Sequence, residues 1–491
     1  IATKLIDFLA QLEDFQKKLW LKKKFVTETN YCITLDRVPE ELYDEIATNE
    51  SQREEWVKLF AIDEIGVSQE REENKDKELF EEETISYTVP LTVEFLKAND
   101  KLVLDTAFFS HEFKAKLIET IEDFDEQCDG LLIHSENFQA LNLLQERYRE
   151  QVKCVYIDPP YNTGNDGFAY KDNYKSSSWL SMIQAPLPII EKITKEDDAF
   201  FAMSIDKRQL FESKSLFDSS FKRFSFVNAI VNVNNPKGRS DQKHLPTAHD
   251  NIVLFATDGA VSHGWKPANK VLRRYREQDE EGKYREIDLR KTGDNDLATD
   301  RPKMAYPFAY NEETTDLLPI SDPEKCPVGY FLIFPMKDKI TKGRWRWELK
   351  TSQNNINRLI AKYQPQKQQW SVFEKDYLGE DERVFPTSVW DEKSFNSERG
   401  TESLSHLGFD KDVFTRPKPV GLLCHLIEHL NRDGDFTLDY FAGSGTTGHA
   451  VISLNREDNL KIPGSGNRKY ILVEMGDYFD TVTKPRITKV I

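Results

Sequence analysis

Four consecutive residues in the first half of the chain combine a carboxylate, a rigid backbone and an aromatic ring: Asp158, Pro159, Pro160 and Tyr161. They follow Cys154–Ile157, a short apolar run that predicts a strand. Two successive prolines fix the backbone and remove two amide donors, which leaves carbonyl oxygens free as acceptors. The Asp158 carboxylate and the Pro159 carbonyl can accept both hydrogens of an exocyclic amino group, while Tyr161 can stack on a flat base. This set suits chemistry on the amino group of a nucleobase.

A glycine-rich segment near the end of the chain, Phe441–Gly448, follows an apolar run and opens a helix-like pattern. Gly443, Gly445 and Gly448 have the spacing Gly-x-Gly-x-x-Gly, which lets the backbone approach a ligand while amides at the helix start face it. Glu474 ends the next apolar run, and its carboxylate can accept hydrogen bonds from two ribose hydroxyls. The segment indicates a cofactor that contains adenosine, either a dinucleotide or S-adenosylmethionine. A tight turn that only packs helix against strand is the alternative.

The two segments together favour methyl transfer to an amino group. The lone pair of an amino nitrogen on a base is delocalised into the ring, so the nitrogen is a poor nucleophile. Two acceptors that pull the group towards tetrahedral geometry localise this lone pair, and a sulfonium methyl held in line completes the arrangement. Neither a metal nor a covalent enzyme intermediate is required. A base within duplex DNA must be flipped out first, and an aromatic partner offsets part of the unstacking cost.

At this point the sequence resembles the β-class DNA amino-methyltransferases, especially the modification subunits of Type III restriction–modification systems. The resemblance rests on Asp158–Gly164 (DPPYNTG), on Phe441–Thr447 (FAGSGTT) and on the order of the two, and it covers residues 130–491. It implies a Rossmann-like, mostly parallel, doubly wound α/β sheet with permuted motif order and an inserted DNA-recognition domain. It also implies site-specific transfer from S-adenosylmethionine to adenine N6, within a restriction–modification or phage-defence system.

The resemblance further implies roles for single residues. Ile133–Asn137 is similar to the segment whose acidic residue contacts the cofactor adenine, with Glu136 where Asp is usual. Lys418 lies in a segment similar to the one that lines the methionine end of the cofactor. Tyr170 and Trp179 match positions near the pocket, with packing beneath the catalytic loop as the alternative. The cofactor-binding residues expected are Glu136, Asn137, Lys418, Phe441, Gly443, Gly445, Thr446 and Glu474, and the catalytic residues expected are Asp158, Pro159, Pro160 and Tyr161.

These segments divide the chain of 491 residues into four parts. Apolar residues at three- and four-residue steps predict a helical N-terminal region over residues 1–125. Alternating strand and helix signals, including Ala199–Ile205 and Asn251–Ala256, predict parallel βα units in a catalytic half over 126–257. Residues 258–413 lack this regularity and are expected to form the target-recognition insert. Residues 414–491 contain the glycine segment and form the cofactor-binding half.

The net charge of −17 at first argues against a nucleic-acid partner. The charge is segregated, however: residues 36–83 contain 18 acidic and 6 basic side chains, whereas residues 337–367 contain 9 basic and 2 acidic ones. Within the basic stretch, Lys342, Arg344, Trp345 and Arg346 interleave cations with an indole, a pattern typical of phosphate contact, guanine readout and base stacking. We expect these four residues to contact DNA, with core packing of the tryptophans as the alternative. The acidic run Gln69–Glu83 is expected to be a solvated helix face or linker.

Other classes of protein are disfavoured. Five cysteines without Cys-x-x-Cys spacing argue against a disulfide scaffold or structural zinc, and no apolar run reaches membrane-spanning length. His425–His429 matches the His-x-x-Glu-His pattern of zinc peptidases, but no third ligand is evident and no metal is expected. The start of the chain has neither an initiator Met nor a secretion-signal layout, and we expect a fragment or processed form of a cytoplasmic protein.

Three alternative functions remain open. Cytosine-N4 methylation needs the same two acceptors, and only the resemblance favours adenine. An NAD-dependent dehydrogenase would use the glycine segment but leave Asp158–Tyr161 without a task. A non-catalytic DNA-specificity subunit is the third alternative. The partners expected are double-stranded DNA, a second copy of the chain and a nuclease or helicase restriction subunit.

Overall fold

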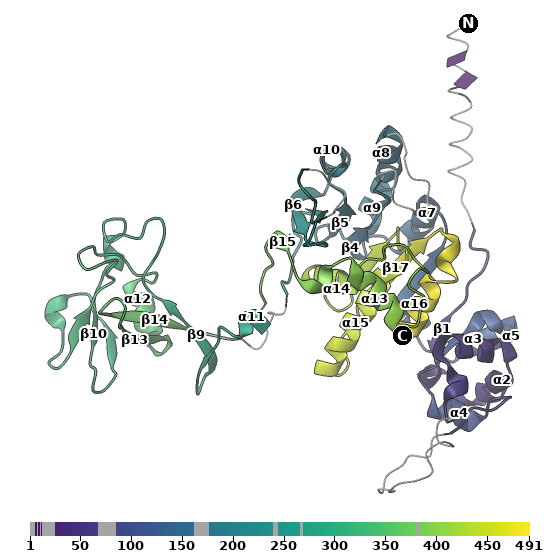
Figure 1. Ribbon diagram of the computed structural model, residues 1–491, viewed down its shortest axis with the longest axis horizontal. Coiled ribbons are helices and arrows are strands. Elements are labelled where there is room, and N and C mark those ends of the chain that lie inside the picture. Colours follow the sequence, from purple (N-terminus) through teal and green to yellow (C-terminus); the bar gives the residue numbers. More distant parts are fainter. Residues whose placement is uncertain are drawn as a thin grey trace. The chain divides into compact units, whose positions relative to one another are not determined.

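The computed structural model describes residues 5–6, 8–9, 11, 25–66, 85–161, 176–238, 244–265, 269–379 and 383–491. The chain forms two compact units (Figure 1), one made of Ile1–Trp265 with Phe385–Ile491 and the other of Lys266–Val384. The acidic run at residues 69–83 and Tyr170 lie outside the described residues.

An eight-stranded sheet forms the centre of the first unit. Its strands, in spatial order, are β15 (Val389–Trp390), β6 (Ser225–Asn232), β7 (Asp250–Ala256), β5 (Phe200–Ile205), β4 (Val152–Ile157), β16 (Phe436–Asp439), β17 (Lys469–Glu474) and β3 (Gly130–His134). All neighbours are parallel except β7, which is antiparallel to both β5 and β6. The expected mostly parallel sheet is therefore confirmed, but the prediction that residues 251–256 belong to a parallel unit is wrong. The sequence prediction missed β6, and since no described helix lies between β6 and β7, β7 returns antiparallel.

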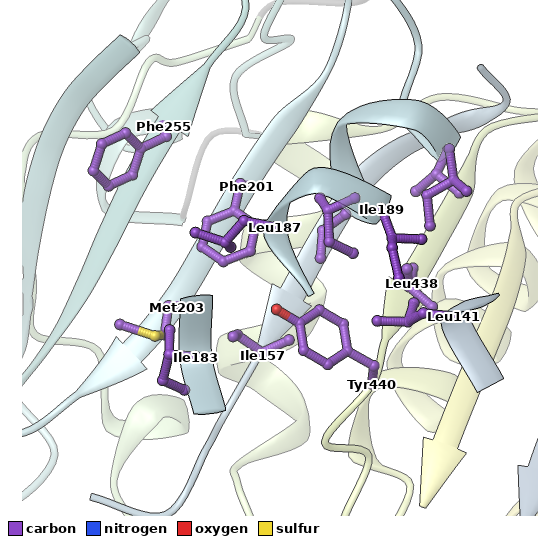
Figure 2. Close-up of a cluster of buried hydrophobic side chains, with 14 of the residues drawn as sticks. Leu141, Ile157, Ile183, Leu187, Ile189, Phe201, Met203, Phe255, Leu438 and Tyr440 are labelled. Atoms are coloured by element: carbon purple, nitrogen blue, oxygen red, sulfur yellow. The ribbon is translucent and has the colours of Figure 1, made fainter. Parts of the chain in front are cut away.

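Helices cover both faces of this sheet. Along β4, Val155 and Ile157 join one buried cluster while Cys154 and Tyr156 join another, because successive side chains of a strand point to opposite faces. The first face packs on α7 (Asn137–Arg147), α8 (Ser176–Gln184), α9 (Leu187–Ile193) and α10 (Leu210–Ser220), and the second on α14 (Val420–Leu430), α15 (Thr446–Lys461) and α16 (Thr483–Val490). Figure 2 shows Ile183, Leu187 and Ile189 from the helices of the first face beside Ile157, Phe201, Met203 and Leu438 of the strands. The sheet is doubly wound, as the sequence predicts.

The chain leaves the sheet in opposite directions from β4 and β16. These two strands are parallel neighbours, yet β4 leads through α8 and α9 to β5 on one side, whereas β16 leads through α15 to β17 on the other. Open α/β sheets bind ligands at such a switch point, outside the carboxyl ends of the strands. The Asp-Pro-Pro-Tyr segment follows β4, and the glycine-rich segment follows β16.

The N-terminal region also belongs to the first unit. It contains the short helices α2 (Tyr43–Ala47), α3 (Glu50–Phe60), α4 (Val93–Ala98), α5 (His111–Glu119) and α6 (Phe124–Gln127), and an antiparallel pair, β1 (Cys32–Thr34) with β2 (Val103–Asp105), that the helical prediction did not include. Trp56 is fully buried and donates its indole N–H to the Val103 carbonyl oxygen at 2.7 Å. The region contacts α16 through an ion pair between Asp105 and Lys484.

The second unit has its own core. One sheet has the order β13 (Leu359–Gln364), β14 (Gln369–Tyr377), β9 (Gly282–Asp288), β8 (Glu277–Asp279), and another the order β11 (Leu317–Pro319), β10 (Phe308–Tyr310), β12 (Phe331–Ile333), with the short helices α11 (Asn269–Leu272) and α12 (Leu349–Asn354). Residues 385–413, which the sequence prediction includes in the insert, instead pack in the first unit, where they supply β15 and α13 (Glu398–His406). The compact second unit is thus shorter than the predicted insert.

Candidate active site

The Asp-Pro-Pro-Tyr segment begins immediately after β4. Pro159 and Pro160 are buried, whereas Asp158 and Tyr161 are half-buried at the edge of the sheet. Trp179 of α8 is fully buried and donates its indole N–H to the Pro160 carbonyl oxygen at 2.7 Å. Trp179 therefore supports this turn from beneath, which is the packing alternative that the sequence left open.

Lys418 joins the predicted catalytic segment to the predicted cofactor segment. Its Nζ lies 2.8 Å from Asp158 Oδ1, donates to the Tyr161 hydroxyl at 2.8 Å and stands 4.9 Å from the centre of the Tyr161 ring. Its backbone carbonyl oxygen accepts a hydrogen bond from the Thr446 hydroxyl at 3.3 Å. Desolvation, and then the Asp158 carboxylate, raise the pKa of Tyr161, so this phenol stays neutral. One lysine thus contacts both halves of the site.

The glycine segment forms a tight loop between β16 and α15. Gly443 and Gly445 have φ angles of 53° and 79°, in the left-handed region that glycine adopts most easily. The Gly443 amide donates to Glu474 Oε2 at 2.7 Å, and Glu474 Oε1 accepts from the amides of Met475 and Gly476 at 2.8 Å each. Glu474 is 2% exposed, and burial raises its pKa. The acidic residue predicted to bind ribose therefore lies directly beside the glycine loop.

The predicted adenine-contact segment ends at the same edge. Ser135 donates its backbone N–H to the Glu474 carbonyl oxygen at 3.0 Å, which ties the segment to the end of β17. The Glu136 carboxylate caps α7 by accepting from the amides of Phe138 and Gln139 at 3.2 and 3.0 Å. Asn137 is the first residue of this helix and is half-buried. Glu136 thus fixes the start of α7 next to the glycine loop.

Asp439 and Phe414 also shape the loop, and the sequence did not single them out. Asp439 accepts from the Phe441 amide at 3.0 Å and from the Thr447 hydroxyl at 2.6 Å. Burial raises its pKa to about 7. A Cβ atom added at Gly443 would lie 3.3 Å from Cζ of Phe414, so the ring limits the space at this glycine. The position of Asp439 at the end of β16 is a signal that could have identified it, whereas Phe414 lies in a segment without periodicity.

The residues present fit S-adenosylmethionine. The Phe414 ring narrows the space at Gly443, and a buried carboxylate stands beside its amide, as an adenosine cofactor with free ribose hydroxyls requires. Carbonyl and hydroxyl groups of the loop are held by α16 from beneath. The turn that joins β16 to α15, together with the first residue of that helix, therefore contains four of the expected cofactor-binding residues, Phe441, Gly443, Gly445 and Thr446.

The four predicted DNA-contact residues lie in the second unit, apart from this site in the sequence. Trp345 is 1% exposed and donates its indole N–H to the Tyr306 carbonyl oxygen at 2.7 Å. Arg344 is 8% exposed and donates to the Asn295 carbonyl oxygen at 2.5 Å. The core-packing alternative thus describes Trp345, and the expectation of DNA contact does not fit the burial of these two side chains. Arg346 pairs with Glu374 at 2.6 Å, and Lys342 alone of the four is exposed.

The two histidines of the His-x-x-Glu-His pattern, His425 and His429, form hydrogen bonds with neighbouring backbone groups. His429 Nδ1 accepts from the Gly264 amide at 3.1 Å, and His425 Nδ1 lies 2.8 Å from the Gly421 carbonyl oxygen. Within the described ranges, no group of three or more histidine, cysteine or acidic side chains is arranged to hold a metal ion. A search of the same ranges for a helix able to cross a membrane finds none.

Comparisons with known proteins agree with these motifs. A family model described as a DNA methylase matches residues 152–484. The Type II methyltransferase M.KpnI of Klebsiella pneumoniae is 30% identical over 376 residues, which cover 74% of this chain and 85% of that protein. The Mod subunit of the Type III restriction-modification enzyme EcoPI, from Escherichia phage P1, is 27% identical over 391 residues, which cover 72% of this chain and 58% of that protein. Among solved structures, the M1.HpyAVI–SAM complex is 13% identical, covers 73% of this chain and 98% of that chain, and has a TM-score of 0.35.

Proposed function

The chain belongs to the N6/N4 DNA methylase family, and from this premise we propose that it transfers a methyl group from S-adenosylmethionine to adenine N6 in double-stranded DNA. We further propose that it acts as a site-specific modification enzyme of a restriction–modification system in the cytoplasm. The names of its relatives support this role, as one is a Type II methyltransferase and another the Mod subunit of a Type III enzyme.

One observation carries the proposal. The carboxyl ends of β4 and β16 are neighbours, and they bring Asp158–Tyr161 and the glycine loop together through Lys418, whose side chain contacts one segment and whose carbonyl contacts the other. Because the two segments lie far apart in the chain, this juxtaposition is a property of the fold. A dehydrogenase would need only the glycine loop.

The side chains present account for the handling of the amino group. The Asp158 carboxylate and the Pro159 carbonyl accept its two hydrogens, and Tyr161 stacks on the flipped base. The Lys418 ammonium, which now forms an ion pair with Asp158 at 2.8 Å, would move aside for the incoming amino group. S-adenosylmethionine, when bound, supplies the methyl group on a positively charged sulfur. As the new N–C bond forms, the S–C bond to the methyl group would break with its electron pair left on the sulfur, and the amino nitrogen would pass one proton to the Asp158 carboxylate that accepts its hydrogen bond.

We prefer adenine N6 to cytosine N4 as the substrate because the first residue of the tetrapeptide is Asp158. This preference comes from the resemblance to the adenine-N6 enzymes of the family. The two amines present the same pair of hydrogens, so the acceptor geometry fits both. A second copy of the chain and a restriction subunit remain proposed partners.

The test replaces Asp158 by Ala. We expect transfer of tritiated methyl groups from S-adenosylmethionine to unmethylated bacterial DNA to fall at least 100-fold, because an acceptor aimed at the developing charge is lost. Binding of S-adenosylmethionine, measured by calorimetry, should change by less than threefold. Mass spectrometry of nucleosides from DNA treated with wild-type protein should show N6-methyladenine.

The control is Asp218→Ala, which removes an exposed carboxylate on α10 that pairs only with Lys214 among the described residues. It should leave transfer at the wild-type rate. If Asp158→Ala also transfers at that rate, the proposed mechanism is wrong, and N4-methylcytosine as the product would select the alternative substrate.

A further inference from the structure

Arg486 of α16 is a buried cation that the proposed mechanism does not use. Its side chain has no exposed surface. Burial lowers the pKa of its guanidinium to about 9, so the group still carries its charge at neutral pH. An isolated buried charge is costly unless a partner compensates it.

All the hydrogen-bond partners of Arg486 in the described structure are neutral groups of the glycine loop and the first turn of α15. Nη1 donates to the Ser444 hydroxyl at 2.7 Å, to the Ser444 carbonyl oxygen at 3.3 Å and to the Thr446 hydroxyl at 2.9 Å. Nε donates to His449 Nδ1 at 3.3 Å. Burial and then the Arg486 charge lower the pKa of His449 to about 3, so this imidazole is neutral and can accept. Nη2 is buried and has no hydrogen-bond partner among the described residues.

Other buried cations of the first unit have carboxylates. Arg468 is 5% exposed and lies 2.7 Å from Asp458 and 3.7 Å from Asp433. Lys153 is 1% exposed and pairs with Asp198. Within the described ranges no carboxylate pairs with Arg486, so a positive charge directly beneath the glycine loop is left uncompensated. A negatively charged ligand group on the other side of the loop would compensate the positive charge of Arg486.

We propose that Arg486 is a positioning residue for the carboxylate of the cofactor's methionine portion. It holds Ser444 and Thr446 in place from beneath, and its uncompensated charge favours an anion above the loop. The inference rests on the proposed function, since S-adenosylmethionine carries one anionic group, this carboxylate, and Arg486 donates to Ser444 and Thr446 of the loop that would bind the cofactor. Arg486 touches no reacting atom in this account.

A merely structural role would have a different consequence. If Arg486 only braced the loop, its loss would weaken every ligand of the loop by the same factor. If its charge acts on the carboxylate, its loss weakens ligands with the carboxylate and spares those without it. S-adenosylmethionine and decarboxylated S-adenosylmethionine differ in this group alone and are the matched probes.

The experiment measures the Kd of both compounds by calorimetry for the full chain and for Arg486→Gln, which keeps hydrogen-bond donors but not the charge. We expect S-adenosylmethionine to bind about tenfold more weakly to the variant and the decarboxylated compound to change by less than threefold, the tenfold difference being about 1.4 kcal/mol. If the fully buried position does not tolerate Gln, Arg486→Met is the second variant: it also removes the charge while keeping a side chain of similar length, and the same selective loss of S-adenosylmethionine binding is expected.

The control Arg468→Gln removes a paired buried arginine and should leave the ratio of the two Kd values unchanged. Equal weakening of both compounds in the Arg486 variant that folds, or no weakening of either, overturns the inference. Failure of wild-type protein to bind S-adenosylmethionine would instead overturn the proposed function.

Discussion

Burial of the Asp439 carboxyl beside the glycine loop lowers the stability of the folded protein when this group is ionised. The carboxyl is 2% exposed, and burial raises its pKa to about 7 from the ordinary 3.8. Between these two values the folded protein binds a proton that the unfolded chain has released, so stability falls as pH rises from about 4 to about 7. Above that range the folded state must bury a charge, with the Phe441 amide and the Thr447 hydroxyl as its only hydrogen-bond donors among the described residues.

Asp439→Asn removes this charge and should therefore raise the Tm at pH 8 more than at pH 5. The measurement is thermal unfolding of wild type and variant across that range, with Asp218→Ala on α10 as a control whose difference from wild type should not depend on pH. A difference from wild type that is the same at every pH would show that folding does not shift the pKa of Asp439.

The sequence allowed the prediction of residue types with chemistry but not of their partners. Asp158–Tyr161 and Gly443–Gly445 could be recognised because their functions depend on local backbone properties, two prolines in one case and positive φ angles in the other. Lys418 at Asp158 and Arg486 at Ser444 are contacts across long stretches of chain. Spacing contains no signal for such contacts, since they form only when the sheet brings the strand ends together.

At the scale of elements, α13 supports the segment that contains Lys418. A Cβ atom added to Gly400 would lie 1.8 Å from the Pro417 carbonyl oxygen, which is backbone and cannot rotate away. Alanine normally stabilises a helix interior relative to glycine by about 1 kcal/mol. Here the close approach of α13 to residue 417 reverses that preference.

Gly400→Ala should therefore lower the Tm and reduce methyl transfer at least tenfold, because residues 416–419 must shift and Lys418 moves with them. Arg399→Ala, at the exposed neighbouring position of the same helix, is the control and should alter neither quantity appreciably. A Gly400→Ala protein with a higher Tm and full transfer would show that α13 adjusts without disturbing the site.

Some elements could be predicted closely. The strands expected at Cys154–Ile157 and Ala199–Ile205 are β4 and β5, whose first residues differ from the expected ones by two positions and one position. Both are strongly apolar segments with clear ends. β1, β2 and β15 have only two or three residues each, too few for a period, and their existence depends on a partner strand.

At the scale of the whole molecule, the sequence suggested an insert but not its bounds. Charge and loss of periodicity marked residues 258–413, yet residues 385–413 complete the first unit by pairing β15 with β6 and placing α13 on residue 417. Composition does not distinguish them from the insert, because what assigns them is long-range packing. The alternation of arginine and tryptophan at Arg344–Trp347 suggested DNA contact, but long-range packing places Trp345 in the buried core of the second unit.

The second unit should fold when expressed alone as residues 266–384. It has roughly 120 residues, an ordinary size for a domain, and a core of its own that includes the buried residues Leu289, Phe308, Trp345 and Val372. We expect a cooperative thermal transition by circular dichroism, with tryptophan fluorescence changing at the same temperature.

Trp345→Ala should abolish the transition, since losing a core tryptophan costs about 3–5 kcal/mol, a large part of the stability of a small domain. Lys342→Ala, at an exposed position, should leave it unchanged. A broad, non-cooperative transition in the unsubstituted fragment would mean that the core of the second unit depends on the rest of the chain.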